Sequence, residues 1–210
     1  MGGNAKFPVS MAQIQLPGVE VEMFLNPPFQ MRRYFEQDRA SGRGLMPHLC
    51  STGHVVYDPY GTLAELQVEA RAIWEAGPPA LNARAIWHIR YATADGLRDI
   101  QDVLQADPAR AAYLIGWWLP QIVSNYYRIK RRWQIKPKRV LTELETWDMP
   151  AATLARRACL GSVTERFAAL QALSEHTLAP LGGLMPLAWS SDWEALAADP
   201  AAADTGATGT

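Results

Sequence analysis

Cysteine, long apolar runs and net charge are all scarce in this chain of 210 residues. Its two cysteines, Cys50 and Cys159, can form neither a disulfide framework nor a zinc site built on cysteine. No apolar run approaches the roughly 20 residues that span a bilayer, and the first ten residues lack the pattern of a signal peptide. The 20 lysines and arginines nearly balance the 21 aspartates and glutamates. This composition excludes a strongly cationic coat protein and predicts a cytoplasmic protein without a membrane partner.

The composition changes near residue 61. Before it, proline and glycine punctuate short segments in which apolar residues alternate; after it, apolar residues recur with helical spacing. The predicted fold is therefore α+β: a small, partial β-sheet region over residues 1–61, followed by an antiparallel helical bundle over residues 62–196. Residues 197–210 are rich in alanine, glycine, threonine and aspartate, which predicts a disordered tail.

Three short segments of the first region have strand character. Residues 7–16 and 19–25 alternate around Pro17-Gly18, a pair typical of turns, and so predict a β-hairpin. Residues 55–57, Val-Val-Tyr, predict a further short strand.

Helical spacing dominates the rest of the chain. The capping box Thr62–Glu65 and the pair Asp107-Pro108 each mark the start of a helix. The predicted helices cover residues 29–38, 45–52, 62–76, 80–105, 108–133, 137–147, 150–160 and 164–178.

Glu20 and Glu22 stand two residues apart in the second predicted strand, so strand periodicity places both carboxylates on one face. Adjacent carboxylates repel each other and attract a cation, and carboxylate oxygens are the ligands that Mg²⁺ prefers. The alternative interpretation is an ordinary polar face of a hairpin that is exposed to solvent.

A cationic stretch joins two of the predicted helices. It follows Tyr126 and Tyr127, whose rings we expect to be available for stacking, and it predicts a site for phosphate or an RNA backbone. The alternative is that these cations only complement the dipole of a helix C-terminus. The basic residues are Arg128, Lys130, Arg131, Arg132, Lys136, Lys138 and Arg139.

These segments together resemble the nucleotidyltransferase superfamily, in particular the kanamycin-nucleotidyltransferase and minimal-nucleotidyltransferase group. The resemblance rests on the acidic strand Val19–Phe24, the Arg-Arg-Tyr-Phe of residues 32–35, the Gly-His-Val-Val-Tyr-Asp-Pro-Tyr-Gly of residues 53–61, and the segment 126–144. It implies a transfer of a nucleotidyl group from an NTP to an acceptor, with Mg²⁺ as cofactor. By resemblance, Glu20 would be the third metal-binding and catalytic carboxylate, with Glu22 beside it, and Lys136, Lys138 and Arg139 would contact phosphate.

The chain also departs from the pattern of this family. The Gly-Ser turn and the Asp-x-Asp strand that carry the first two carboxylates are missing, because the eighteen residues before Val19 contain no acid. We therefore expect a truncated or catalytically incomplete nucleotidyltransferase-like protein. The alternative is a helical interaction module without enzymatic activity, either an antitoxin-like partner or a nucleic-acid-binding bundle. The unpaired edge of the hairpin further predicts a homodimer.

Overall fold

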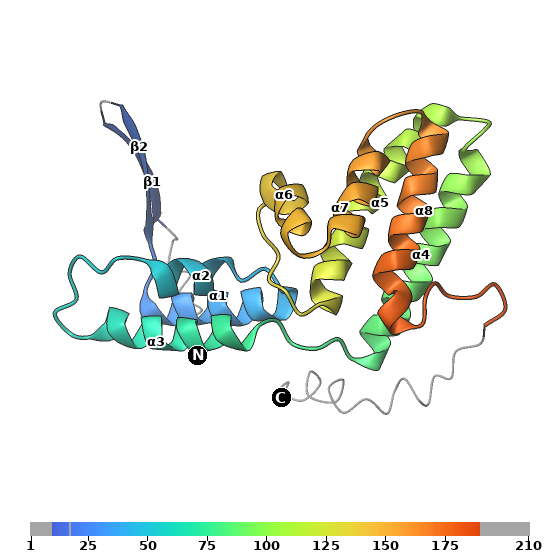
Figure 1. The fold of residues 1–210 in the computed structure, drawn as a ribbon. Helices are drawn as coiled ribbons and strands as arrows, with labels where there is room; N and C mark the ends of the chain where they lie inside the picture. Colours follow the sequence, from blue (N-terminus) through green and yellow to red (C-terminus); the bar gives the residue numbers. More distant parts are fainter. Residues whose placement is uncertain (1–9, 17, 190–210) are drawn as a thin grey trace, which may run out of the picture. The chain divides into compact units, whose positions relative to one another are not determined.

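The computed structural model describes residues 10–16 and 18–189 of the chain (Figure 1). They form two compact units, one that ends at Gly77 and one that begins at Pro78. The predicted tail over residues 197–210 lies outside the described residues. No helix among the described residues is long and apolar enough to cross a membrane.

The first unit begins with a β-hairpin. Strand β1 (Ser10–Leu16) pairs antiparallel with β2 (Val19–Leu25), and Gly18, at φ 79°, occupies the turn. A φ in this range suits glycine, which has no Cβ to clash with the backbone. The hairpin is therefore where the alternation and the Pro-Gly pair predicted it.

Three helices follow the hairpin in the first unit: α1 (Pro28–Ser41), α2 (Leu45–Thr52) and α3 (Thr62–Ala76). Their small core consists of Phe35, Leu66 and Ala70, all of which are almost completely buried. An ion pair between Arg32 on α1 and Glu69 on α3, at 2.7 Å, links the two helices at the surface.

The predicted α+β class is wrong, because the described residues are overwhelmingly helical. Their strands are confined to the β1–β2 hairpin, and no wider sheet packs against the helices. The segment predicted as a strand at residues 55–57 is a loop in which Val56 and Tyr57 are largely exposed. Apolar β-branched residues favoured a strand locally, but a strand also needs a neighbour to accept its backbone hydrogen bonds.

The second unit is an all-helical bundle (Figure 1). Its helices are α4 (Ala83–Val103), α5 (Pro108–Ile129), α6 (Pro137–Trp147), α7 (Met149–Cys159) and α8 (Val163–Leu178), followed by the single 3₁₀ turn η1 (Ala179–Leu181). Its core is contributed mainly by α4, α5, α7 and α8, and includes Ile100, Ile115, Leu170 and Leu173. The unit boundary at Gly77 assigns α3 to the first unit, whereas the composition change had placed residues 62–76 with the bundle.

Candidate functional site

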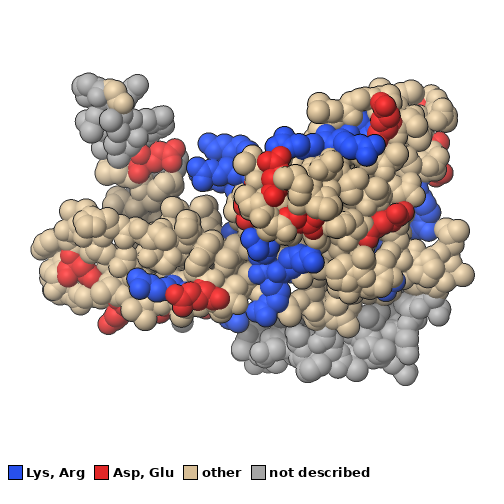
Figure 2. Space-filling model, in the orientation of Figure 1, with Lys and Arg blue, Asp and Glu red and all other residues tan. Residues whose placement is uncertain are grey.

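The most distinctive surface of the bundle lies where α5 passes into α6. Residues 128–139, which we call the junction segment, contain seven cations and no acid, although the whole chain has a formal net charge of −1. The chain has only four lysines, and three of them lie in this segment, at positions 130, 136 and 138. Figure 2 shows blue side chains gathered over the part of the bundle that carries α6. The near-neutral average therefore conceals a local positive field.

Local backbone geometry creates the junction segment. Helix α5 ends at Ile129, and Arg131 takes the left-handed conformation at φ 51°. Proline at the first position of α6 then starts the next helix, since its ring fixes φ and its missing N–H is not needed there. The predicted extension of α5 to residue 133 stops four residues early, because the left-handed residue breaks the helical path.

Three cations of the junction segment are available to a ligand. Lys136 immediately precedes α6, and Lys138 and Arg139 lie in its first turn. All three side chains are exposed, and none forms an ion pair or a side-chain hydrogen bond with another described residue. These are the residues that the sequence predicted as phosphate contacts, and the structure places them together.

Three other cations of the segment are engaged by the bundle itself. Arg132 lies over the Trp147 ring, at 4.7 Å from its centroid, and its Nη2 is 3.9 Å from Oε1 of Glu143. Lys130 lies 5.4 Å from the centroid of the Tyr126 ring. Arg131 donates from Nε to the backbone carbonyl of Pro78 at 3.1 Å. These contacts hold the segment in place. Arg128 is partly buried, so Lys136, Lys138 and Arg139 are the exposed cations without a described partner.

Tyr126 and Tyr127 do not stack on a ligand, contrary to the sequence-based expectation. Both are buried, at 2% and 1% exposure, and their rings pack against Trp147 with centroids 5.3 and 5.4 Å from that of the indole. Each hydroxyl donates to a carboxylate, that of Tyr126 to Asp148 and that of Tyr127 to Glu143. Their consecutive positions on α5 place both side chains at the buried contact with α6 and α7.

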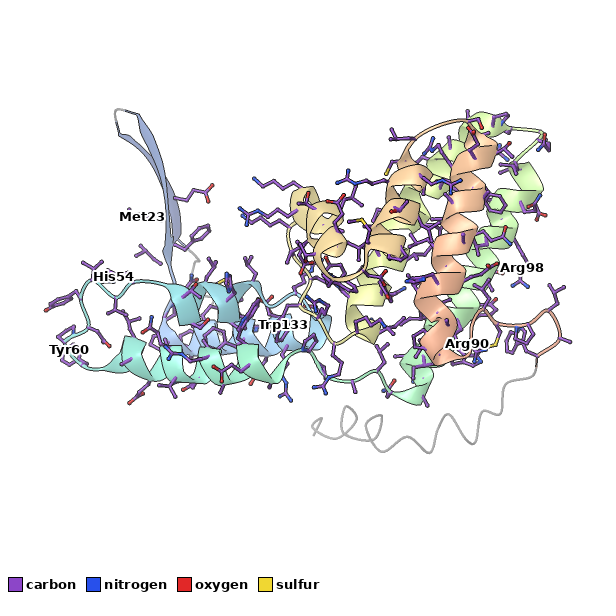
Figure 3. All side chains as sticks on the ribbon, in the orientation of Figure 1. Met23, His54, Tyr60, Arg90, Arg98 and Trp133 are labelled. Atoms are coloured by element: carbon purple, nitrogen blue, oxygen red, sulfur yellow. The ribbon has the colours of Figure 1, made fainter. Side chains whose placement is uncertain are left out.

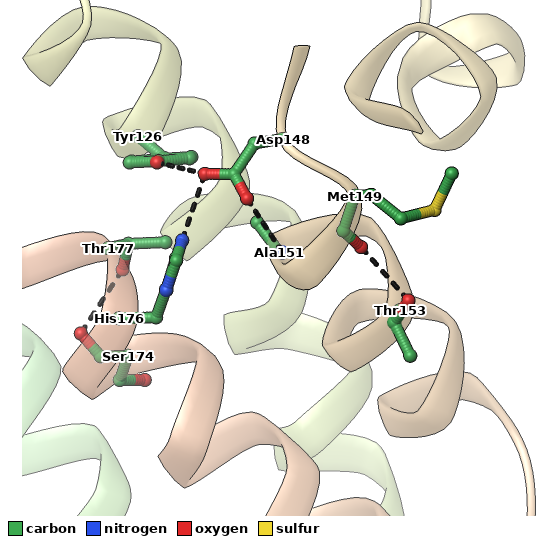
Figure 4. A network of polar contacts seen from close by, with 8 residues as sticks. All are labelled: Tyr126, Asp148, Met149, Ala151, Thr153, Ser174, His176 and Thr177. Atoms are coloured by element: carbon green, nitrogen blue, oxygen red, sulfur yellow. Dashed lines mark hydrogen bonds and ion pairs between the residues drawn. The ribbon is translucent and has the colours of Figure 1, made fainter. Parts of the chain in front are cut away.

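Asp148 is the central acceptor of a hydrogen-bond network in the second unit (Figure 4). It separates α6 from α7, and its Oδ1 caps α7 by accepting from the amide of Ala151 at 3.0 Å. Its Oδ2 accepts from the Tyr126 hydroxyl and from Nε2 of His176 on α8, at 2.8 Å. Burial alone would raise the pKa of this carboxyl, but the hydrogen bonds from His176, Tyr126 and Ala151 outweigh burial and hold the pKa below its ordinary value.

Glu143 is the corresponding hydrogen-bond acceptor on α6. Its Oε2 accepts from the Tyr127 hydroxyl and from Nε1 of Trp147 at 3.3 Å, so it ties α6 to α5. Burial raises the pKa of Tyr127 well above its usual range, and the hydrogen bond to Glu143 is the second largest cause of this increase. Neither Glu143 nor Asp148 was selected from the sequence; the N-cap pattern Asp148-Met149-Pro150 was the available signal for the latter.

Glu20 and Glu22, the predicted metal ligands, lie in the first unit. The register of the hairpin places Glu20 opposite Gln15 and Glu22 opposite Gln13, so both acids occupy alternate positions of β2 on one face. The Glu22 side chain is exposed, and the Glu20 side chain lies outside what the structure describes. Within the described residues, no group of three His, Cys, Asp or Glu side chains could hold a metal.

No family model, curated protein or solved structure matches the chain. The functional argument therefore rests on the site itself. In the second unit its distinctive elements are the three exposed cations at the start of α6 and the buried hydrogen bonds of Tyr126 and Tyr127; the two acids on β2 belong to the first unit.

Proposed function

We propose that this chain is a nucleotidyltransferase-like protein whose helical unit binds the phosphate groups of a substrate at Lys136, Lys138 and Arg139. The observation that carries the proposal is the set of three exposed cations at the start of α6 without a described acidic partner. Cations that serve only to stabilise a helix are expected at its C-terminus, where they complement the dipole. These three lie at an N-terminus, where the dipole opposes them and an anion is favoured.

The start of α6 reinforces the positive field of its side chains. No side chain caps its first amides, and residue Pro137 provides no N–H of its own. The N-terminus of a helix carries about half a positive charge and attracts phosphate. Side-chain and backbone charges therefore act in the same direction at this surface.

The two acids of β2 fit a role in binding Mg²⁺. Glu20 and Glu22 occupy alternate positions on one strand, and carboxylate oxygens are the ligands that a hard divalent cation prefers. When bound, Mg²⁺ would neutralise the negative charge of the phosphate groups. Two acids from one strand form only one side of a magnesium site for in-line transfer, so we expect the chain by itself to bind nucleotide without efficient transfer.

The proposal can be tested by calorimetric titration with MgATP. We expect binding by the wild-type chain and a loss of about tenfold or more in affinity for the variant K136A/K138A. The matched control is R84A, because Arg84 is an exposed cation on α4 in the same unit. Equal affinities of the K136A/K138A variant and the wild type would contradict the phosphate site.

A second titration tests the acidic strand. The variant E20Q/E22Q should bind Mg²⁺ more weakly than the wild type in a titration with the metal alone, and its affinity for metal-free ATP should be unchanged. Incubation with Mg²⁺ and labelled ATP should give little label on an acceptor. Rapid incorporation of label would contradict the expectation of catalytic incompleteness.

The alternative, a helical interaction module, is favoured by a different observation. The loop between α2 and α3 exposes three large side chains, Val56, Tyr57 and Tyr60, at 89%, 77% and 90% of their surface. The edges of the β1–β2 hairpin also have no described strand as a neighbour, which suits a homodimer. Sedimentation equilibrium distinguishes association through this loop from pairing through β1. A dimer that is unaffected by Y57S/Y60S but abolished by a proline at position 13 would support pairing through β1.

A further inference from the structure

The three free cations of the junction segment point in different directions. Lys138 and Arg139 are consecutive residues of α6, so their side chains leave the helix about 100° apart. Lys136 precedes the helix and has an extended backbone, at ψ 135°. A site for one compact phosphate needs donors that converge on a point, whereas these cations are spread around the start of the helix.

The remaining contacts of the segment suit an extended anion. Figure 3 shows side chains with nitrogen tips that project from α6 into solvent. Tyr126 and Tyr127 are buried and bonded to carboxylates, so they offer no platform for a base. The surface therefore provides charge for a phosphate backbone without stacking for bases, which is the pattern of contacts that position a nucleic acid without reading its sequence.

The residue types agree with this interpretation. Lys136 and Lys138 are two of only four lysines in a chain that otherwise uses arginine for its positive charges. A lysine ammonium is a compact and strongly hydrated charge on a flexible stem, and it contacts a phosphate without fixing its orientation. Such contacts adapt to successive phosphates along a chain.

We propose that the substrate recognised at Lys136, Lys138 and Arg139 is a polynucleotide acceptor, whose phosphodiester backbone crosses the start of α6. This inference rests on the proposed function, which assigns phosphate binding to the same residues. It adds that these residues bind the successive phosphates of an acceptor chain more tightly than the phosphates of a free nucleotide. Recognition at this surface is then independent of sequence and sensitive to salt.

The first experiment is a fluorescence anisotropy titration of the full chain with a labelled 20-nucleotide single-stranded RNA at 50 and 200 mM NaCl. Three phosphate contacts on a single strand give a slope of log K against log salt of about −2, or a loss of roughly 20-fold over this range. The variant K136A/K138A/R139A should lose that salt dependence and most of the affinity. R84A should bind as the wild type does, and circular dichroism of each variant checks that it is folded.

The second experiment detects binding at Lys136 and Lys138 while every lysine keeps its charge. Reductive ¹³C-methylation keeps the charge of a lysine, and the chain has lysines only at positions 6, 130, 136 and 138. Addition of the unlabelled RNA should shift the signals of Lys136 and Lys138, and Lys6 should stay unchanged. An equal phosphate concentration of ATP should shift the signals of Lys136 and Lys138 by a smaller amount.

The results distinguish this inference from the function on which it rests. If ATP shifts the signals of Lys136 and Lys138 and RNA does not, the polynucleotide inference is overturned while phosphate binding stands. If the triple variant binds both RNA and ATP as the wild type does, the inference and the proposed phosphate site both fail. Weakened RNA binding in the triple variant, with R84A unaffected, supports both.

Discussion

Nε2 of His176, on α8, lies 2.8 Å from Oδ2 of Asp148, the residue between α6 and α7. Because an ionised carboxylate can only accept, Nε2 carries the hydrogen in this contact. The Asp148 side chain is only 13% exposed, and the Tyr126 hydroxyl donates to the same oxygen. One carboxylate therefore joins α5, α7 and α8.

Replacement of this carboxylate should destabilise the bundle. D148N keeps the size of the side chain but removes the charge that the three donors share, and we expect a loss of about 2–3 kcal/mol in the free energy of unfolding at pH 7. Urea denaturation followed by circular dichroism measures it. D102N, at an exposed position of α4, is the matched control and should change stability little.

The same carboxylate makes stability depend on pH. Its folded-state pKa is depressed, so its contribution is complete above the unfolded pKa of about 3.9 and is lost as the pH falls through the folded value. The stability gap between wild type and D148N should therefore be constant from pH 5 to 7 and shrink below pH 4. A gap that stays constant down to pH 2.5 would contradict the assignment.

The hydroxyl of Tyr127 should stabilise the attachment of α6 to α5. Y127F removes its hydrogen bond to Glu143, and we expect a loss of about 1 kcal/mol at pH 7. Burial raises the pKa of Tyr127, so the wild-type advantage is present below the ordinary tyrosine pKa of about 10 and is lost as the pH rises further. Ultraviolet titration should show one late-ionising tyrosine fewer in the variant, and Y113F, which alters an exposed residue, should not.

Gly96 on α4 should tolerate no side chain. A Cβ at this position would lie 2.0 Å from Cε2 of Trp118 on α5, so G96A forces the two helices apart. We expect a loss of about 2–3 kcal/mol. Gly116 is the matched control, because it is an exposed helical glycine with no atom within 4 Å of the added Cβ, and G116A should stabilise the protein by about 0.5–1 kcal/mol. Thermal unfolding measures both variants. Equal effects of the two substitutions would show that Gly96 does not pack closely against Trp118.

Arg90 on α4 should hold the segment that follows η1. Its guanidinium donates to the carbonyls of Gly183 at 2.7 Å, Gly182 at 3.1 Å and Leu184 at 3.4 Å, and both glycines have positive φ. Without these bonds the segment keeps only the packing of Leu184 on the core and the ring contacts of Trp189 with Trp87 and Tyr91, so we expect R90A to increase the rate of proteolytic cleavage within residues 182–189 severalfold. R84A, on the same helix, should be cleaved at the wild-type rate; an unchanged rate in R90A would show that other contacts suffice.

Local signals predicted the ends of several helices correctly. Asp107 caps α5 ahead of its proline, as expected from a short pattern that needs only neighbouring residues, and a capping box of the same local kind, Ser162 with Glu165, begins α8. The same reasoning failed at Thr62. Gly61 is the N-cap of α3, and the Asp58 carboxylate accepts from the amide of Ala64 at 3.0 Å, because the loop brings a more distant acid to the helix.

The sequence by itself determined the hairpin, most helices of the bundle and the cationic junction segment, since alternation, helical spacing, proline and charge act between near neighbours in the chain. Only the tertiary structure decided that the strands of residues 10–16 and 18–189 are confined to one hairpin, that Tyr126 and Tyr127 face the core, and that Lys136, Lys138 and Arg139 have no partner among these residues. Those outcomes depend on partners far apart in sequence. Asp148 meets His176 across 28 residues, and no local pattern specifies such a pair.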